Sequence, residues 1–177
     1  HFLRERLAEG QKLMVYFLTC ACVDYYSGVL PLLEGLKGAN IRPLHGKMAP
    51  KTRTKTYEWF QKGHEATGAA LLCTDVAARG LDIPDVDWIV QFDAPQDPNA
   101  FVHRVGRTAR MGRAGRAVLF LRPHEDAYVH FLHLRKVPLH RIEPTDGLQP
   151  LRAEMTKLLV ADRALMEGAA KAFVAYV

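Results

Sequence analysis

The chain has 177 residues, of which 49% are hydrophobic and 24% charged, a composition that excludes a disordered segment and is typical of a folded globular domain. Lys and Arg number 24 against 19 Asp and Glu, so the formal net charge is +5. No apolar run approaches the ~20 residues of a membrane-spanning helix, so we expect no membrane contact. Because the first residue is His1 and not methionine, we expect the chain to be a piece of a longer one. An odd number of cysteines, 3, without a C-x-x-C pair argues against disulfides and a zinc site and favours a reducing intracellular compartment.

The excess positive charge is concentrated in one segment. The thirteen residues Arg104–Arg116 contain five arginines and no acidic residue, and the rest of the chain carries equal numbers of basic and acidic residues. This distribution argues against a diffusely basic nucleic-acid-binding tail. It predicts one concentrated anion-facing segment.

Short, nearly all-apolar runs alternate with amphipathic stretches along the first 135 residues. The predicted strands are Leu13–Leu18, Ile41–Leu44, Ala69–Cys73, Trp88–Phe92 and Ala117–Leu121. The predicted helices cover about Cys22–Leu36, Pro50–Lys62, Pro98–Val105 and Glu125–Arg135. Strands that are apolar on both faces, in alternation with helices, predict an α/β fold with a doubly wound parallel sheet flanked by helices.

The pattern changes after Arg135. Residues 136–147 contain two prolines and a Thr-Asp-Gly turn and are interpreted as a connector. Residues 148–177 are predicted to form one long helix that docks an apolar stripe on the preceding domain. The stripe consists of Leu151, Met155, Leu158, Leu159, Leu165, Met166, Ala169 and Phe173. We therefore divide the chain into a domain at 1–143 and the start of a helical C-terminal extension at 144–177.

Polar residues follow the first three predicted strands. They are Thr19, the pair His45-Gly46 and the pair Thr74-Asp75. Ligands of open α/β sheets bind beyond the carboxyl ends of the strands, so these positions are candidates for a ligand-binding edge. The alternative is that each residue only caps a helix or forms a turn.

The stretch Thr74–Asp82 has a second set of candidate ligand-binding groups. Gly80 permits close approach of the backbone to a ligand, Asp82 can accept hydrogen bonds from sugar hydroxyls, and Thr74 can donate to a phosphate. The alternative is a short helix that Asp75 caps and Gly80 ends, with Arg79 and Asp82 paired.

The arginine segment contains two residues with the chemistry of a phosphate clamp. Arg107 and Arg110 are three residues apart and follow a glycine, so both can point toward one phosphate, and their always-charged planar guanidinium groups suit its oxygens. The alternative is a solvated basic loop, or one that binds the nucleic-acid backbone generally.

Two of these stretches together resemble a known family. A-R-G-L-D at Ala78–Asp82 and H-R-V-G-R-T-A-R at His103–Arg110 resemble motifs V and VI of the DEAD-box RNA helicases. Val15–Thr19 is similar to motif IV, and His45-Gly46 with Arg53 is similar to motif IVa. The resemblance covers about residues 1–143 and implies the second, C-terminal RecA-like domain of the helicase core.

The resemblance implies ATP and RNA as ligands. Arg107 and Arg110 would be arginine fingers toward the γ-phosphate of ATP, and Asp82 with Gly80 would hold the ribose. The positions implied to contact RNA phosphates are Gly46, Arg53 and Thr74, and those implied to couple the two domains are Arg79 and His103. The remaining arginines of the segment are not finger positions and are assigned a solvated or structural role: Arg104, Arg113 and Arg116.

The hallmarks of the family's first domain, G-x-G-K-T, D-E-A-D and S-A-T, do not occur in the sequence. The first domain of the family supplies the lysine, the Mg²⁺ ligands and the group that positions water. We therefore expect this chain to hold no metal and to be inactive as an ATPase without a first RecA-like domain as its partner. Two alternatives stay open: a non-catalytic RNA-binding or protein-docking module, and a DNA-directed translocase.

The C-terminal residues carry a finer resemblance. Ala161–Ala164 and Lys171–Val177 resemble the C-terminal extension of a nucleolar subgroup that assists assembly of the large ribosomal subunit. The resemblance implies a role in rRNA processing, pre-rRNA as the RNA partner, contact with pre-60S assembly factors, and location in the nucleus and nucleolus.

Overall fold

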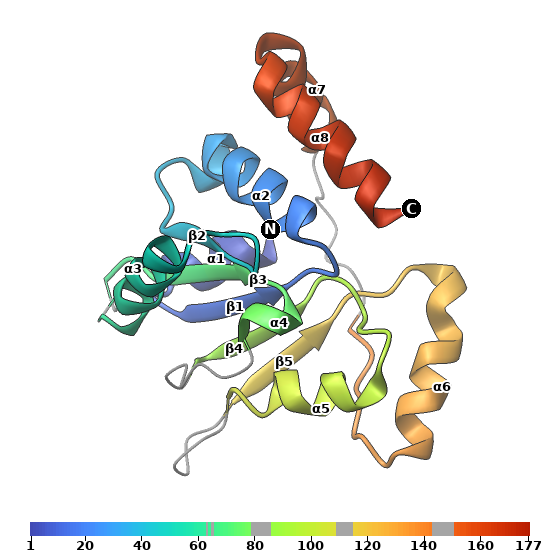
Figure 1. The fold of residues 1–177 in the computed structure, drawn as a ribbon. Helices are drawn as coiled ribbons and strands as arrows, with labels where there is room; N and C mark the ends of the chain where they lie inside the picture. Colours follow the sequence, from blue (N-terminus) through green and yellow to red (C-terminus); the bar gives the residue numbers. More distant parts are fainter. Residues whose placement is uncertain (63, 65, 79–85, 109–114, 143–150) are drawn as a thin grey trace.

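The computed structural model of the chain describes residues 1–62, 64, 66–78, 86–108, 115–142 and 151–177. Its strands are β1 (Lys12–Tyr16), β2 (Ile41–Leu44), β3 (Ala69–Cys73), β4 (Trp88–Gln91) and β5 (Arg116–Leu119). They form one parallel sheet in the order β2-β3-β1-β4-β5 (Figure 1). The predicted parallel α/β sheet is confirmed, and two strands, β2 and β3, have the bounds that the sequence predicts.

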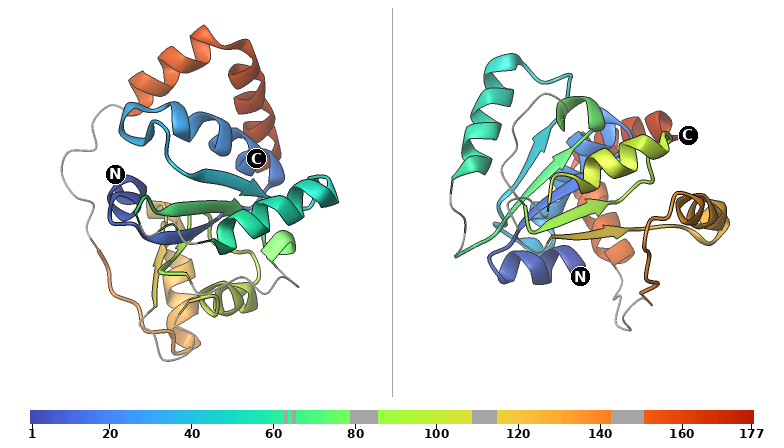
Figure 2. Two further views of the ribbon diagram at one scale, coloured as in Figure 1. Left: turned by 90° about the vertical axis from the view of Figure 1, so that its left-hand side faces the viewer. Right: turned by 90° about the horizontal axis from the view of Figure 1, so that it is seen from below.

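Helices cover both faces of this sheet (Figure 2). On one face lie α3 (Pro50–Gln61), the short α4 (Asp75–Ala78) and α5 (Pro98–Val105), and on the other lie α1 (Phe2–Ala8), α2 (Cys20–Val29) and α8 (Arg163–Tyr176). The remaining helices are α6 (Asp126–Leu134) and α7 (Leu151–Ala161), with 3₁₀ turns at Leu30–Leu32, Glu34–Leu36 and Pro123–Glu125. The sheet is thus the middle of three layers, as the all-apolar strands predict.

The core consists of two apolar layers that the strands separate. Successive side chains of a strand point to opposite faces, so Met14 and Tyr16 pack with Phe60 of α3, whereas Leu13 and Val15 pack beneath α1 and α2. Every residue of β3 is buried. Burial of a large apolar side chain contributes roughly 1.5–3 kcal/mol, so these two layers are the main source of stability.

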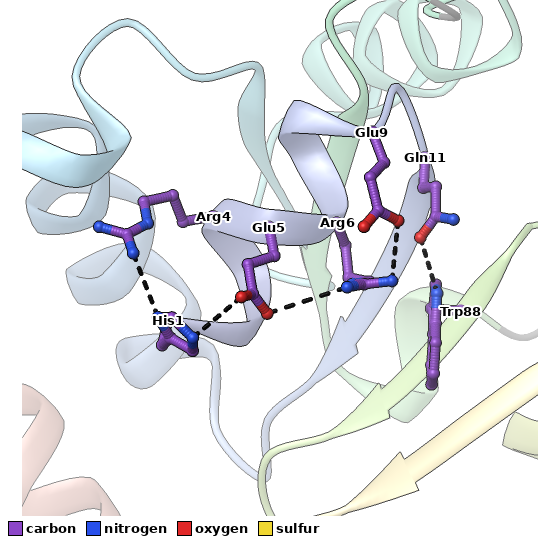
Figure 3. A network of polar contacts seen from close by, with 7 residues as sticks. All are labelled: His1, Arg4, Glu5, Arg6, Glu9, Gln11 and Trp88. Carbon is purple, nitrogen blue, oxygen red and sulfur yellow. Dashed lines mark hydrogen bonds and ion pairs between the residues drawn. The ribbon is translucent and has the colours of Figure 1, made fainter. Parts of the chain in front are cut away.

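Helix α1 is an element that the sequence analysis did not predict. It is short and its N-cap makes no side-chain hydrogen bond, so it lacks the usual signals of a helix start. Tertiary contacts hold it on the sheet: the Phe2 ring meets Trp88 edge-on at 4.9 Å, and just beyond α1 Gln11 Oε1 accepts a hydrogen bond of 2.8 Å from Trp88 Nε1 (Figure 3). The exposed ion pairs of Figure 3, such as Arg6 with Glu9 at 2.8 Å, contribute less than this packing.

Two predicted helices end earlier than expected. α2 stops at Val29, and two 3₁₀ turns continue to Leu36, since Pro31 lacks the amide hydrogen that an α-helix needs there. The single helix predicted over 148–177 is wrong, because α7 and α8 are separate. Asp162 adopts an extended conformation, φ −129° and ψ 110°, and its carboxylate accepts hydrogen bonds from the amides of Ala164 and Leu165 at 2.8 and 3.2 Å. Asp is among the best N-cap residues, so Asp162 starts a new helix.

The predicted docking of the C-terminal helix is confirmed for α8. This helix packs along α2 (Figure 1), where Ala172 is 5% exposed and its carbonyl lies 3.7 Å from Cys22 Sγ. The stripe is only partly covered, because Met166 and Phe173 are 51% and 68% exposed. Gly28 of α2 lies at this contact, where a Cβ built on it would be in ordinary van der Waals contact with Leu165 at 3.7 Å.

The predicted domain boundary at 143–144 lies outside the described residues, as do residues 143–150 of the connector and of the predicted helix start. Lys136 begins the connector with φ 59°, a left-handed conformation that ends the path of α6. A helix with the length and apolarity of a bilayer span does not occur in the part of the chain that the structure describes.

Candidate functional site

The polar residues after β1, β2 and β3 lie at one edge of the sheet, because these strands are parallel and in register. Thr19 is explained by the helix-cap alternative: its Oγ1 accepts a hydrogen bond of 3.1 Å from the amide of Cys22 at the start of α2. His45 and Thr74 differ from it, since they are only 3% and 6% exposed. The ligand-edge interpretation therefore rests on β2 and β3.

Two of the predicted RNA contacts present buried polar atoms. Thr74 Oγ1 and Arg53 Nε are inaccessible to water and lack a hydrogen-bond partner among the described residues. Buried polar groups are nearly always paired in native proteins. A hydroxyl and a guanidinium N–H are donors of the kind that phosphate oxygens accept from, but both atoms are closed to solvent here, so an RNA phosphate would reach them only after the side chains move.

Gly46 lies next to the segment that begins with Thr74. A Cβ built on Gly46 would lie 3.8 Å from Val76 Cγ1, which places the turn after β2 against the first residues of α4. Gly46 itself is exposed. The structure thus brings the predicted RNA-contact positions of β2 and β3 to one surface, and Arg53 follows one turn into α3.

Arg104 is the most connected residue of the site and is buried, with 2% exposure. Its Nε and Nη2 donate to the two carboxylate oxygens of Asp75 at 2.7 and 2.8 Å, and its Nη1 donates to the carbonyl of Asp93 at 2.8 Å and to Gln91 Oε1 at 3.3 Å. The guanidinium also lies 4.8 Å from the centre of the Tyr16 ring. Of the two roles that the sequence left for Arg104, the structural one is confirmed and the solvated one is wrong.

Arg104 therefore does not contribute to an anion-facing surface of the arginine segment. The anion that Arg104 faces is Asp75 of the same chain, the first residue of α4. Arg116 is exposed and lies with its guanidinium carbon 5.4 Å from the Trp88 ring centre. The Arg104–Asp75 pair joins α5 to the end of β3 and so holds two separate motifs together.

Arg107 lies on the turn that ends α5. Its amide donates to the carbonyl of Arg104 at 3.1 Å, and the next residue, Thr108, is 5% exposed and donates its hydroxyl to the carbonyl of Val86. Arg107 itself is half-buried. Its positive charge acts to lower the pKa of Tyr16, but burial dominates and raises that pKa, so Tyr16 stays neutral. The turn that carries this candidate finger is therefore anchored on both sides.

Several predicted site residues are not covered by the structure. Those that lie outside the described residues are Arg79, Gly80, Asp82, Arg110 and Arg113. His103 is described and exposed on α5, in the last turn of the helix. Its predicted role in coupling two domains stays a prediction.

Asp93 follows β4 at the same edge and was not among the residues predicted from the sequence. Asp93 is 6% exposed, and its Oδ2 accepts a hydrogen bond of 3.0 Å from the amide of Leu18, so it joins the ends of β4 and β1. Burial raises the pKa of this carboxyl, and the bond from Leu18 and the charge of Arg104 oppose that rise. An acid directly after an apolar run was the available signal, the same one that singled out Asp75.

A second acid-free basic stretch also escaped the sequence analysis. Between Glu34 and Glu58 the chain has six basic residues other than histidine and no acid: Lys37, Arg42, Lys47, Lys51, Arg53 and Lys55. Lys47, Lys51 and Lys55 are exposed in the turn after β2 and on α3. Counting charges along the whole chain would have found this stretch, which adds positive charge beside Gly46.

The described residues do not bring together three or more His, Cys, Asp or Glu side chains in a way that could hold a metal ion. His130 and His133 share a face of α6, and the described residues place no third ligand beside them. The three cysteines are free thiols, with Cys22 and Cys73 buried and Cys20 half-buried.

Comparison with known sequences identifies the family. A model of the helicase conserved C-terminal domain matches residues 1–117. The chain is 49% identical over 167 residues to the DEAD-box ATP-dependent RNA helicase 18 of Arabidopsis thaliana. The aligned region covers 94% of this chain and 28% of the relative. The chain is 46% identical over 178 residues to the human ATP-dependent RNA helicase DDX55. The aligned region covers 100% of this chain and 28% of the relative. The chain spans 26–31% of the length of such relatives.

Solved structures agree with this result. The fold is similar to Mss116p DEAD-box helicase domain 2 bound to an RNA duplex, with a TM-score of 0.69 and 26% identity over 97% of this chain and 70% of the other. It is also similar to the E. coli DEAD-box protein SrmB in complex with the regulator of ribonuclease activity A, with a TM-score of 0.65 and 30% identity over 80% and 82% of the two chains. The chain therefore belongs to the helicase conserved C-terminal domain family, in the form that DEAD-box RNA helicases carry as their second RecA-like domain.

Proposed function

We propose that this chain is the second half of an ATP-dependent RNA helicase that remodels RNA duplexes or ribonucleoproteins. The observation that carries the proposal is the buried Arg104–Asp75 pair, which holds the turn of Arg107 beside the strand end of Thr74. One rigid unit then presents a candidate ATP contact and a candidate RNA contact. The names of the relatives, all ATP-dependent RNA helicases, support the same activity.

On the ATP side, we assign Arg107 and Arg110 as arginine fingers and Gly80 with Asp82 as the ribose contact. ATP supplies a γ-phosphoryl group whose transfer to water develops negative charge on its oxygens. A guanidinium held at the end of an anchored helix neutralises that charge without having to reorganise. The anchoring of the Arg107 turn through Arg104 supports this role.

The described residues do not fit a Mg²⁺ site, because they bring no cluster of metal ligands together. We therefore assign the Mg²⁺ ligands to a first RecA-like domain. We also assign the phosphate-binding lysine and the water-positioning group to that domain, since the sequence of this chain has neither G-x-G-K-T nor D-E-A-D. Because these groups are assigned to the first domain, we propose that this chain alone does not hydrolyse ATP.

On the RNA side, Gly46, Arg53 and Thr74 are assigned to phosphate oxygens. Their support is the exposure of Gly46, the exposed lysines beside it, and two donors, on Arg53 and Thr74, that lack a hydrogen-bond partner among the described residues. The similar Mss116p domain 2 was solved with an RNA duplex, which supports duplex RNA as a ligand. Contacts to the backbone alone carry no sequence information, so binding should be largely independent of sequence. His103 and Arg79 are assigned to contact the first domain.

The cellular role that we propose is rRNA processing in assembly of the large ribosomal subunit. Its support is the resemblance of Ala161–Ala164 and Lys171–Val177 to the extension of the nucleolar subgroup. Pre-rRNA and pre-60S assembly factors would then be the partners, and the nucleolus the location. Accumulation of large-subunit rRNA precursors when the protein is depleted would support this role, and normal precursor levels would contradict it.

Substitution of the two candidate fingers tests the enzymatic proposal. In the full-length helicase that carries this chain, Arg107→Ala and Arg110→Ala should each lower RNA-stimulated ATP hydrolysis by about 10³-fold or more, the lower range measured for arginine fingers. ATP and RNA binding should change little. The control is Arg116→Ala, which removes an exposed arginine of the same segment and should leave turnover unchanged.

Unchanged turnover in the finger variants would contradict the assignment. RNA-stimulated phosphate release by the 177-residue chain alone would contradict the proposed division between two domains. The RNA surface is tested separately by Arg53→Ala, which should reduce the slope of log Kd against log salt concentration by about one, as expected for the loss of one phosphate contact.

A further inference from the structure

The side chain of His45 is held by an acid from another element. His45 follows β2 and its side chain is 4% exposed, and its Nε2 lies 2.7 Å from Oδ1 of Asp24 on α2. Asp24 is 61% exposed, so the pair joins a buried ring to a carboxylate at the surface. Nδ1 of His45 is also buried, and within the described parts of the chain it has no hydrogen-bond partner. The bond to Asp24 is therefore the polar contact that fixes the ring in the described structure.

His45 is the first residue of the turn that contains Gly46. The backbone closes the turn, because the Met48 amide donates to the His45 carbonyl at 3.2 Å and the His45 amide lies 3.4 Å from Met48 Sδ. Gly46 and Lys47 project from this turn into solvent. The turn follows β2, an edge strand that pairs with β3 alone.

Asp24 also lines the small groove between α2 and α8, together with Lys171 of α8. The groove is otherwise apolar, and α8 rests on the same face of α2. Asp24 thus stands between the C-terminal helix and the turn of Gly46. It does not follow a strand and belongs to no motif that the sequence analysis assigned.

We infer that Asp24 is a positioning residue for RNA binding: its hydrogen bond to His45 holds the turn at 45–48 so that Gly46 meets an RNA phosphate. The inference rests on the proposed RNA role of Gly46. An alternative is that Asp24 is only a surface acid near a basic region. The two predict opposite effects, because loss of a surface acid tightens binding of an anion, whereas loss of a positioning bond weakens it.

The test measures binding of the 177-residue chain to a fluorescein-labelled RNA duplex by fluorescence anisotropy. Asp24→Ala should weaken binding about five- to tenfold, as expected for loss of one hydrogen bond in a ligand-binding arrangement. Asp24→Asn keeps an oxygen that can accept from His45 Nε2 and should bind within about twofold of the wild type. The control variant Asp126→Ala removes an exposed acid of α6 and should bind as tightly as the wild type or more tightly.

Melting temperatures and the NMR resonance of the Gly46 amide show whether each variant folds and whether the turn moves. Asp24→Ala should shift that resonance, and Asp24→Asn should not. Should Asp24→Ala fail to fold, Asp24→Ser takes its place with the same expectation.

Binding of Asp24→Ala as tight as wild type, or tighter, overturns the inference. If Arg53→Ala still weakens RNA binding in that case, the RNA surface stands and only the role of Asp24 is lost. If neither variant weakens binding, both the RNA surface and the role of Asp24 are wrong.

Discussion

Replacement of Arg104 by methionine tests whether the buried ion pair holds the site together. Methionine keeps much of the side-chain volume and removes the charge. The substitution leaves the Asp75 carboxylate without its two bonds, and the Asp93 carbonyl and Gln91 Oε1 without theirs. Loss of one partner of a buried pair costs about 3–5 kcal/mol, because an uncompensated charge stays behind. We expect the free energy of unfolding of Arg104→Met to fall by that amount.

Urea denaturation followed by circular dichroism measures this loss. At a slope of about 2 kcal/mol per molar urea, a loss of about 4 kcal/mol lowers the midpoint by about 2 M. The matched control is Arg116→Met, from the same segment but exposed over Trp88, which should cost at most about 1 kcal/mol. The double variant Arg104→Met with Asp75→Asn should be more stable than Arg104→Met alone, since the stranded charge is gone.

A midpoint for Arg104→Met equal to that of Arg116→Met would refute this reasoning, because it would mean that the pair contributes no more than a surface arginine. A double variant less stable than either single variant would refute the explanation by an uncompensated charge. In the full-length helicase, loss of stability in Arg104→Met should be accompanied by loss of ATP hydrolysis, because the Arg107 turn depends on the same anchor.

Three further predictions concern other parts of the fold. Burial raises the pKa of Asp93, so the folded protein binds that proton more tightly than the unfolded chain does, and the ionised carboxylate lowers stability at pH values above the raised pKa. Asp93→Asn should therefore melt at a higher temperature than wild type at pH 7, and this difference in melting temperature should shrink as the pH falls through the raised pKa. A difference that does not change with pH would contradict this cause. Gly68→Ala should lower the urea midpoint more than Gly38→Ala does. Both glycines have positive φ, 61° and 74°, but of the two only Gly68 would place the new Cβ against a backbone oxygen, at 2.7 Å. Equal losses in the two variants would show that the clash is relieved. Burial raises the pKa of the Cys73 thiol, so a thiol reagent at neutral pH should label the half-buried Cys20 first by mass spectrometry, and equal rates would contradict the burial of Cys73.

The sheet could be predicted because its inner strands β1, β3 and β4 are buried on both faces and therefore nearly all apolar. The bounds of β2, β3 and α5 agree with the sequence, since Pro98 and Gly106 mark both ends of α5. The break at Asp162 was missed because helical spacing of apolar residues continues across it, and spacing alone does not record a local cap. Helix α1 was missed because contacts with distant strands stabilise it more than local signals do.

The site could be predicted less completely. The motif resemblance singled out Arg107, but it could not decide between a solvated and a structural role for Arg104, because burial depends on where Asp75 lies after the chain has folded. Asp24 and Asp93 were missed for the same reason: each acts on a residue that is distant in the sequence. Such pairs depend on strand order and helix placement, which residue types and spacing do not specify.

The central position of β1 also has a consequence for synthesis of the protein. β1 leaves the ribosome before either of its partners, β3 and β4, and Lys12 pairs with Ala69. At about 5–20 residues per second, the ribosome takes roughly 3–11 s to make the intervening chain, during which the apolar side chains of β1 have no sheet to join. The nascent chain should therefore depend on chaperones during this interval, and synonymous codons that slow translation between β1 and β3 should lower the yield of soluble protein.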